Sequence, residues 1–222
     1  MPLKDENPTQ RFSYVTVFLI ALNIIIFLLQ VFSSHGLEGS IIRMGAIPYE
    51  LTHFRTLPYF SRISPPLTLL TCMFLHGGLL HLLFNMLYLW IFGNNVEDFL
   101  GPVRYILFYL VSGLGASLTH IIFNPSSRIP MIGASGAIAG VLGAYFLLFP
   151  RANILTFIFL FIFIRVVPIP AAVVLGIWFL MQLLNMGFGG GVAWFAHIGG
   201  FLVGLFLVKI YVRRKQRFSN QH

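Results

Sequence analysis

A serine between small residues opens one of the apolar segments of this chain. Ser135 follows Gly133 and Ala134 and precedes Gly136, at the point where a loop turns into an apolar run. Glycine neighbours permit the sharp turn and the close backbone approach that expose a nucleophilic hydroxyl. A helix that begins here also directs free N–H groups and its positive dipole end toward a developing oxyanion. Taken alone, the pattern also fits a helix N-cap with packing glycines, so a partner residue has to decide.

A histidine inside a later apolar segment is the candidate partner. His197 lies in the sequence Ala-His-Ile-Gly-Gly at 196–200. A titratable side chain within a membrane is costly unless its polar atoms are satisfied, so such residues are usually functional. Gly-x-x-x-Gly stripes that begin at Gly136 and at Gly200 would let the two helices approach closely. His197 would then reach Ser135 as its general base. The alternative is a structural histidine bonded to a backbone carbonyl.

A third polar set lies in an earlier apolar run, where His81 and Asn85 are four residues apart. That spacing places both on one face of a helix, and both side chains can donate hydrogen bonds to an oxyanion. His76 lies five residues before His81 and faces another way, which indicates a different role. Zinc binding is excluded, because the helical zinc motif needs histidines at i and i+4 with a glutamate between them.

Acidic residues are too few and too distant to complete a catalytic triad. None of the carboxylates falls within an apolar run at the depth of His197. The expected mechanism is therefore a Ser-His dyad, with the imidazole held by packing and backbone contacts. The single thiol, Cys72, is expected to be buried as a small hydrophobic residue. The carboxylates are Asp5, Glu6, Glu38, Glu50, Glu97 and Asp98.

The composition is that of an integral membrane protein. Of the 222 residues, 58% are hydrophobic and 9% are charged, whereas soluble domains carry about 25% charged residues. A spanning helix needs about 20 apolar residues, so the length accommodates about six spans in a single domain, 1–222. The net charge is +8, with a basic tail at 209–222. Its cluster of Lys209, Arg213, Arg214, Lys215 and Arg217 favours contact with anionic lipid over nucleic acid binding.

The predicted fold is an all-α polytopic bundle of six transmembrane helices. We place them at 14–32, 67–93, 103–123, 135–149, 171–187 and 192–212. A polar N-terminal tail at 1–13 precedes the first span. An outer loop at 33–66 is long enough that we expect it to fold against the bundle. The fourth span is shorter than the roughly 30 Å hydrocarbon core, so Ser135 is expected to lie recessed in the membrane.

The apolar segment 152–170 has two interpretations. It contains Arg165, Pro168 and Pro170, and we expect a re-entrant or interfacial segment rather than a seventh span. A seventh span would put the basic C-terminal cluster on the outer side. With six spans, Lys and Arg are concentrated on the side that carries both termini, so both termini are expected in the cytoplasm. Ser135 then lies toward the outer side.

The three motifs together resemble the rhomboid family of intramembrane serine proteases. The resemblance implies a six-helix bundle with a water-filled cavity that opens outward. It also implies cleavage of single-span membrane proteins near their outer boundary. The motifs, in the family's order and with approximately its spacing, are His76-x4-His81-x3-Asn85, Gly133-Ala134-Ser135-Gly136 and Ala196-His197-x2-Gly200.

The resemblance also implies a role for each residue. Ser135 is expected to be the nucleophile and His197 the base, while His81, Asn85 and the Ser135 backbone N–H form the oxyanion hole. His76 is expected to tie the outer loop to the second span. Neither a cofactor nor a metal nor nucleic acid is expected, and the expected partners are transmembrane substrates and the lipid bilayer. The structural residues expected near the site are His76, Gly133, Gly136 and Gly200.

This chain departs from the family pattern at two places. Many members carry Trp-Arg where this chain has Leu67-Thr68, and some carry a tyrosine, packed on the catalytic histidine, where this chain has Ala139. A short form without an added N-terminal domain or seventh helix looks like the minimal prokaryotic type. That likeness implies a prokaryotic inner membrane.

The outer end of the fifth span is our expected entry point for a substrate. Trp178, Gln182 and Asn185 lie on roughly one face of that helix. Ordinary packing between helices is the alternative for this face.

Two other classes of function are weighed against the protease. A non-catalytic binder of membrane helices would be free to lose Ser135 or His197, and both are present. A transporter would place charged or broken-helix sites near the bilayer midplane, whereas the polar residues here gather toward one side.

Overall fold

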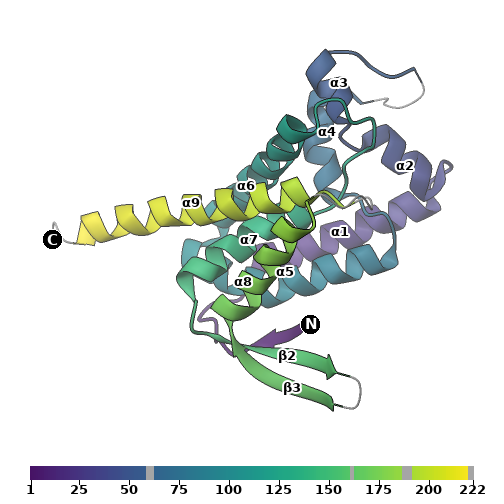
Figure 1. Ribbon diagram of the computed structural model, residues 1–222. Helices are drawn as coiled ribbons and strands as arrows, with labels where there is room; N and C mark the ends of the chain where they lie inside the picture. Colours follow the sequence, from purple (N-terminus) through teal and green to yellow (C-terminus); the bar gives the residue numbers. More distant parts are fainter. Residues whose placement is uncertain (59–62, 161–162, 187–191, 220–222) are drawn as a thin grey trace.

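Helices make up most of this protein, and a small sheet lies at one end of the bundle (Figure 1). The computed structural model describes residues 1–58, 63–160, 163–186 and 192–219. Its helices are α1 (Tyr14–Phe32), α2 (Gly36–Met44), α3 (Pro48–His53), α4 (Pro65–Thr71), α5 (Leu79–Leu100), α6 (Pro102–Phe123), α7 (Ser135–Leu148), α8 (Ala171–Leu184) and α9 (Trp194–Ser219), and its strands are β1 (Pro2–Asp5), β2 (Asn153–Leu160) and β3 (Phe163–Pro170).

The centre of the bundle is α7. Every residue from Ala137 to Tyr145 is buried, and the helix packs against α5, α6, α8 and α9. A helix that is apolar on all sides is stable when other helices enclose it, which is the situation here. The first residue of this enclosed helix is Ser135.

The closest helix pair, α7 and α9, approaches through glycines. A Cβ at Gly200 would overlap the carbonyl oxygen of Gly136, and a Cβ at Gly204 would overlap that of Gly140. The structure therefore has the pairing of glycine stripes that the sequence predicts. Since backbone lies directly against backbone, any side chain at these positions would push the two helices apart.

Four helices in the described part of the chain are long and apolar enough to cross a membrane: α1, α5, α6 and α9 from Trp194 to Arg217. The helices at the predicted fourth and fifth spans, α7 and α8, are apolar but have 14 residues each. That length corresponds to about 21 Å, which is less than the roughly 30 Å core. The count of six spans and the orientation of the termini stay predictions.

The predicted second span, 67–93, is wrong at both ends. The segment breaks into α4, a short 3-10 helix (Cys72–Phe74) and α5, which continues to Leu100. The break contains Gly77 and Gly78, and glycine weakens a helix interior. His76 consequently lies in the connecting loop instead of on a helix face.

The predicted outer loop, 33–66, is folded against the bundle as expected and contains helices α2 and α3. Ala46 and Met131 form an isolated antiparallel bridge, with backbone N–O distances of 3.1 and 2.7 Å. The Tyr49 N–H donates to the Ser127 carbonyl oxygen at 2.9 Å. This region is therefore bonded to the loop that leads into Ser135.

Residues 152–170 are an exception to the all-α prediction, which is wrong here, while the re-entrant placement of the segment stays a prediction. They form an antiparallel hairpin, with β2 paired to β3 from Asn153↔Pro170 to Leu160↔Phe163. Ile, Val and Phe favour extended backbone, and prolines disfavour a helix. Pro168 and Pro170 are accommodated because β3 is an edge strand of the sheet, whose order is β1-β2-β3. The interfacial placement of this segment stays a prediction.

The predicted polar tail, 1–13, contains β1, which is the other edge strand of that sheet. Lys4 pairs with Leu155 and Asp5 with Ile154. The Tyr145 hydroxyl of α7 donates to the buried Asp5 carboxylate at 3.0 Å. Burial raises the pKa of Asp5 above its ordinary value, although the Tyr145 bond acts in the opposite direction. The segment is thus fixed to the central helix.

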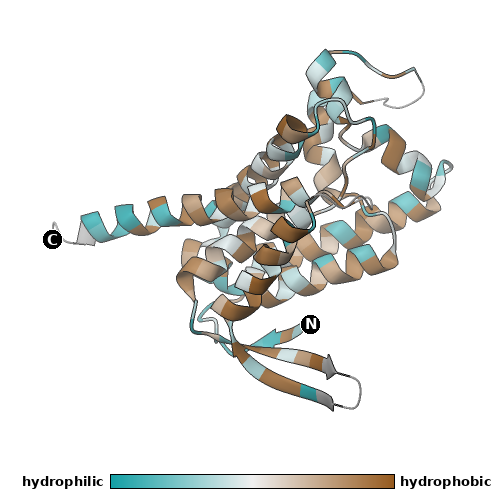
Figure 2. Cartoon of the chain, viewed as in Figure 1, coloured by the Kyte–Doolittle hydropathy of each residue, from teal (hydrophilic) through white to brown (hydrophobic). Residues whose placement is uncertain are grey.

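The predicted basic tail, 209–222, is largely helical, because α9 continues without a break to Ser219. This helix projects beyond the others (Figure 1). Its colouring changes from apolar to polar along its length (Figure 2). Residues 220–222 lie outside the described part of the chain.

The glycine contact between α7 and α9 predicts that Gly204→Ala disrupts folding. The added Cβ meets the backbone of Gly140, and overpacking of this kind costs about 1–3 kcal/mol. Thermal unfolding in detergent should show a lower Tm than that of the wild type. The matched control is Gly176→Ala in α8, where a Cβ would meet no atom within 4 Å. Equal Tm values for the two variants would contradict the close packing.

Candidate active site

Ser135 and His197 lie next to each other although they are far apart in the sequence. The Ser135 Oγ and the His197 Nε2 are 2.9 Å apart. Ser135 is the first residue of α7, and His197 lies in the first turn of α9. The serine hydroxyl therefore bonds to the histidine and does not cap the helix, and no side-chain cap bond is present at this end of α7.

A glutamine fixes the other side of the His197 ring. The His197 Nδ1 and the Gln182 Oε1 are 2.8 Å apart. The Gln182 amide nitrogen donates to the Trp178 carbonyl oxygen at 2.9 Å, so its oxygen is the atom that faces the ring. An amide oxygen only accepts, so Nδ1 carries the proton. Nε2 is then an unprotonated acceptor for the serine hydroxyl.

The sequence interpretation missed this contact. Gln182 was expected at a substrate entry, with the imidazole held only by packing and backbone contacts. Gln182 is in fact 5% exposed and lies behind His197. It precedes His197 on a different helix, and no spacing rule connects positions on separate helices. The only signal available was a polar side chain on an apolar helix.

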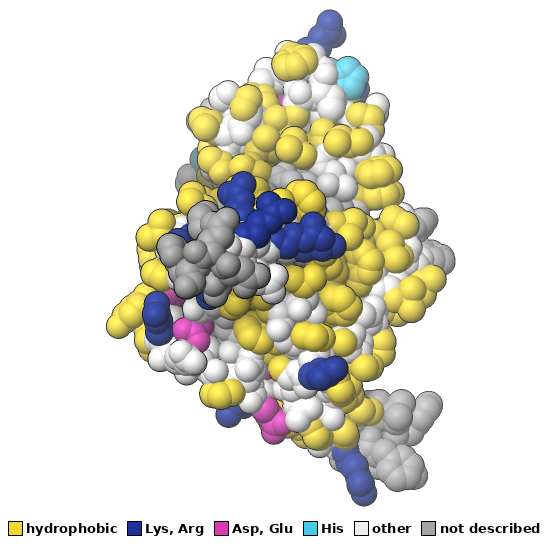
Figure 3. All heavy atoms as spheres, turned by 90° about the vertical axis from the view of Figure 1, so that its left-hand side faces the viewer, with side chains coloured by type: hydrophobic (Ala, Val, Ile, Leu, Met, Phe, Trp, Pro, Cys, Tyr) yellow, Lys and Arg dark blue, Asp and Glu magenta, His cyan; other side chains and the backbone are white. Residues whose placement is uncertain are grey.

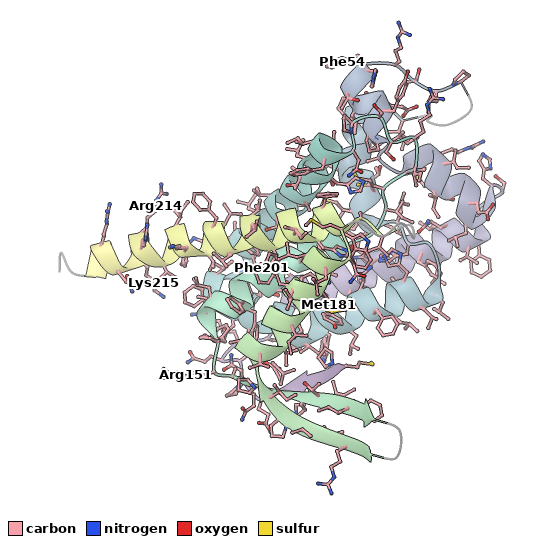
Figure 4. The ribbon with its side chains drawn as sticks, in the orientation of Figure 1. Phe54, Arg151, Met181, Phe201, Arg214 and Lys215 are labelled. Atoms are coloured by element: carbon pink, nitrogen blue, oxygen red, sulfur yellow. The ribbon has the colours of Figure 1, made fainter. Side chains whose placement is uncertain are left out.

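Two tryptophans flank the ring of His197. The ring centroids of Trp178 and His197 are 5.9 Å apart, and those of Trp194 and His197 are 6.2 Å apart at 90°. Trp178 therefore lies where it can support the ring, a task that buried Ala139 cannot perform. Phe201 on α9 packs on Phe179 of α8 with centroids 4.6 Å apart, which holds the two helices together beside the site (Figure 4).

Gly133 leaves space between Ser135 and His81. Its φ is +116°, a value that side-chain-bearing residues rarely adopt. A Cβ there would lie 2.9 Å from the His81 Nε2 and 3.5 Å from the Ser135 Oγ. The missing side chain thus leaves a small volume that both atoms border. A substrate carbonyl oxygen needs such a volume between a nucleophile and a donor.

The tautomer of His81 suits a donor. The Gly77 N–H donates to the His81 Nδ1 at 3.3 Å, which makes that nitrogen the acceptor. The proton is then on Nε2, the atom next to Gly133. The His76 ring contacts the His81 ring edge-to-face at 5.1 Å and supports it from behind.

His76 makes structural contacts before the start of α5. Its backbone, not its ring, bonds to Gln30: the His76 N–H donates to the Gln30 Oε1 at 3.0 Å, and the His76 carbonyl accepts from Gln30 at 3.3 Å. Gln30 belongs to α1, so His76 joins the start of α5 to the first helix. The expected tie between His76 and the outer loop stays a prediction.

The loop before Ser135 is bonded on two sides. The Gly133 N–H donates to the Cys72 carbonyl oxygen at 2.8 Å, and Met131 pairs with Ala46. The Cys72 thiol is buried, as expected. These bonds fix the backbone from which the Ser135 side chain and the first N–H groups of α7 project.

A cavity of about 810 Å³ opens over this site. Asn85 lines it, and the Asn85 Nδ2 has no hydrogen-bond partner among the described residues although it is buried. An unpaired buried donor in a cavity is available to a ligand oxygen. The polar lining includes His81, Asn85, His120, Ser135 and His197. His120 is a lining residue that the sequence interpretation did not single out.

Of the three residues expected at a substrate entry, only Trp178 lines the cavity. Asn185 bonds back to the Met181 carbonyl at 2.6 Å. Among the described residues, no three His, Cys, Asp or Glu side chains gather as a metal site requires.

The Ser135 hydroxyl faces an unprotonated imidazole nitrogen, and beside it lie the space at Gly133 and two donors, His81 and Asn85. This is the layout of a serine hydrolase site. Here that site is enclosed by apolar helices. The Rhomboid domain model matches residues 65–214, and the chain belongs to the rhomboid family. It is an integral membrane protein, as the members of this family are.

Individual relatives agree with this assignment. The chain is 40% identical to RHOMBOID-like protein 4 of Arabidopsis thaliana over 144 residues, 63% of this chain and 32% of that protein. It is 31% identical to the mitochondrial Rhomboid protein 1 of Saccharomyces cerevisiae over 170 residues, 70% and 46% of the two chains. It is 37% identical to Rhomboid protease GluP of Bacillus subtilis over 143 residues, 62% and 24%. The chain thus matches less than half the length of each of these relatives.

Proposed function

We propose that this chain is an intramembrane serine endopeptidase that cleaves single-span membrane proteins near the outer membrane boundary. The observation that carries the proposal is the 2.9 Å contact between the Ser135 Oγ and the His197 Nε2. Family membership and relatives named as proteases support it.

The chemistry follows from the hydrogen bonds. As the Ser135 Oγ attacks the scissile carbonyl carbon, its proton passes to the His197 Nε2, and the new C–O bond gives a tetrahedral oxyanion. The imidazolium then gives that proton to the departing amine, which leaves an acyl-enzyme. A water molecule then gives a proton to the same nitrogen as it attacks the ester carbon. When the bond from that carbon to the Ser135 Oγ breaks, the imidazolium returns the proton to Oγ and the acid product is released.

Three groups stabilise the oxyanion in this proposal. They are the His81 Nε2–H, the Asn85 side-chain amide and the Ser135 backbone N–H at the start of α7. The space that Gly133 leaves between His81 and Ser135 supports this role, as does the unpaired Asn85 Nδ2. The positive end of the α7 dipole adds to the effect.

Gln182 takes the place that a carboxylate holds in a triad. It keeps the His197 proton on Nδ1, so that Nε2 is ready to accept. Being neutral, it avoids the cost of a buried charge in an apolar bundle. The reaction thus uses a Ser-His dyad with a neutral positioning residue.

The substrate meets this site through the cavity. Bulk water does not enter the bilayer core, so the polar cavity has to supply the hydrolytic water. A regular helix hides its carbonyl carbons, so we expect substrates whose transmembrane segment unwinds easily near the scissile bond. We further propose that both termini are cytoplasmic and that Ser135 lies toward the outer side, because basic residues concentrate at the C-terminal end of α9. The likeness to the minimal form of the family favours a prokaryotic inner membrane.

The dyad predicts that Ser135→Ala and His197→Ala abolish cleavage. The purified chain is reconstituted in proteoliposomes with a labelled single-span substrate, and the product is followed on gels. Both variants should cleave at less than about 1% of the wild-type rate, since either loss removes the covalent route. Equal cleavage by the wild type and either variant would exclude the dyad. Substrate binding without cleavage by the wild type would favour the non-catalytic binder.

Asn85→Ala is predicted to lower kcat about 10²-fold, the usual loss for one oxyanion-hole donor. KM should change little, because the bond strengthens only in the transition state. Tm should be close to that of the wild type. A large rise of KM at unchanged kcat would instead assign Asn85 to substrate binding.

Gln182→Leu is predicted to lower kcat/KM about 10-fold, the factor for roughly 1.4 kcal/mol, because the His197 ring loses its acceptor. Gln182→Glu, unlike the leucine variant, keeps an oxygen that accepts from the His197 Nδ1, so this variant should be more active than the leucine variant at high pH. The new carboxylate favours the protonated imidazole. The acidic limb of the pH–rate profile should therefore move to higher pH. A purely structural role for Gln182 would leave that limb unmoved in the glutamate variant.

A further inference from the structure

A second cavity, of about 580 Å³, lies at the opposite end of the same helices. Its walls come from the N-terminal segment, the junction of α5 and α6, and the last turns of α9, and the residues that matter below are Arg11, Asp98, Phe99, Arg104, Tyr211 and Lys215. The first cavity is bordered by the start of α5 and of α9, so the two openings are separated by the length of the bundle.

The lining of this second cavity is cationic. Arg11, Arg104 and Lys215 line it together with a single carboxylate among the described residues, Asp98. That carboxylate is already engaged, since the Gln10 N–H donates to it at 2.7 Å. The bond holds the N-terminal segment in place as a wall. The remaining charge balance favours an anionic ligand.

Aromatic rings hold two of the cations in place. The Arg104 guanidinium lies 5.4 Å from the Tyr211 ring centroid, and the Lys215 Nζ lies 5.3 Å from the Phe99 centroid. Arg104 also donates from Nη1 to the Tyr211 hydroxyl at 3.2 Å. Both cations remain exposed. Side chains that are ordered in this way lose little entropy when they bind an anion.

The cavity lies where the surface changes from apolar to charged. Along α9 the residues are apolar before Lys209 and strongly basic from Arg213 onward (Figure 2). Lys and Arg side chains gather around the C-terminal end of this helix (Figure 3). In a membrane, that level is the level of the lipid headgroups, where tyrosine side chains such as that of Tyr211 also prefer to lie.

We propose that this second cavity binds the phosphate headgroup of an anionic phospholipid in the leaflet on the C-terminal side. Guanidinium and ammonium groups bind phosphate oxygens, and basic pockets between membrane helices on the cytoplasmic side are suited to such headgroups. The bound lipid would join the N-terminal segment, α6 and α9. The inference does not depend on the proposed peptidase activity.

The test compares two double variants of equal net charge. Arg104→Gln/Lys215→Gln removes two cations from the cavity, and Arg213→Gln/Arg214→Gln removes two that do not line it. The side chains of Arg214 and Lys215 project from different sides of α9 (Figure 4). Lys215 lines the cavity and its neighbour Arg214 does not, so the two double variants differ in the position of the lost charge. Each full chain is titrated in detergent with phosphatidylglycerol, with phosphatidylcholine as reference, and bound lipid is counted by native mass spectrometry.

The wild type is expected to retain phosphatidylglycerol in preference to phosphatidylcholine. The cavity variant should bind it roughly 25-fold more weakly, about 5-fold for each charge removed. The control variant should bind nearly as well as the wild type. Equal loss in both variants would overturn the proposal in favour of a diffuse basic surface, and so would displacement of the lipid by millimolar inorganic phosphate.

A third variant guards against misfolding of the cavity variant. Arg11→Gln changes a residue between β1 and α1, outside every helix and strand. It is expected to bind phosphatidylglycerol about 5-fold more weakly at an unchanged Tm. Unchanged binding in this variant would overturn the part of the proposal that assigns the N-terminal segment to the site.

Discussion

The contact of α7 backbone with α9 backbone is the constraint on which the rest of the structure depends. Ser135 and His197 belong to these two helices, and their side chains meet in a hydrogen bond of 2.9 Å near the ends where the helices are in contact. Side chains of ordinary size separate helices by 8–10 Å. Gly143, Gly200 and Gly204 reduce that separation, since a backbone carbonyl oxygen of the facing helix lies where each Cβ atom would be. The chemistry is thus set by residues that have no side chains.

A second constraint is the cost of polarity in an apolar surrounding. Each polar group at the site has a neutral partner or faces the cavity: His197 has Gln182, His81 has the Gly77 backbone, and Asn85 is left for a ligand. A carboxylate in the position of Gln182 would carry a charge that the bundle solvates poorly. Among the described residues, no Asp or Glu lines the cavity around Ser135 and His197, which is consistent with the way the structure orients its histidine.

The sequence predicted the structure correctly where a local pattern of residues is compatible with a single arrangement. Glycine stripes predict close helix packing, and they led correctly to the pairing of α7 with α9. Patterns with competing outcomes were less reliable. The apolar segment 152–170 has the length of a span, but its prolines and β-branched residues favour the hairpin that forms. Gly77 and Gly78 divide the second span, which changes the position of His76. Gln182 was not foreseeable as a histidine partner, because the crossing of α8 and α9 is a tertiary property.

The depth of Ser135 and His197 in the membrane can be estimated from the lengths of α7 and α9, measured from the ends of these helices that lie far from the site. If Tyr211 lies at the headgroup level, His197 is 14 residues away along α9, or about 21 Å. In the enclosed helix α7, Ser135 lies 13 residues before Leu148, or about 20 Å. Both estimates fall about 10 Å short of a 30 Å core, and tilt shortens the projected length further. Under that placement the two helices put Ser135 and His197 at one depth, which supports the proposed position below the outer boundary. Anchoring the C-terminal end of α9 in a headgroup layer would hold that depth constant.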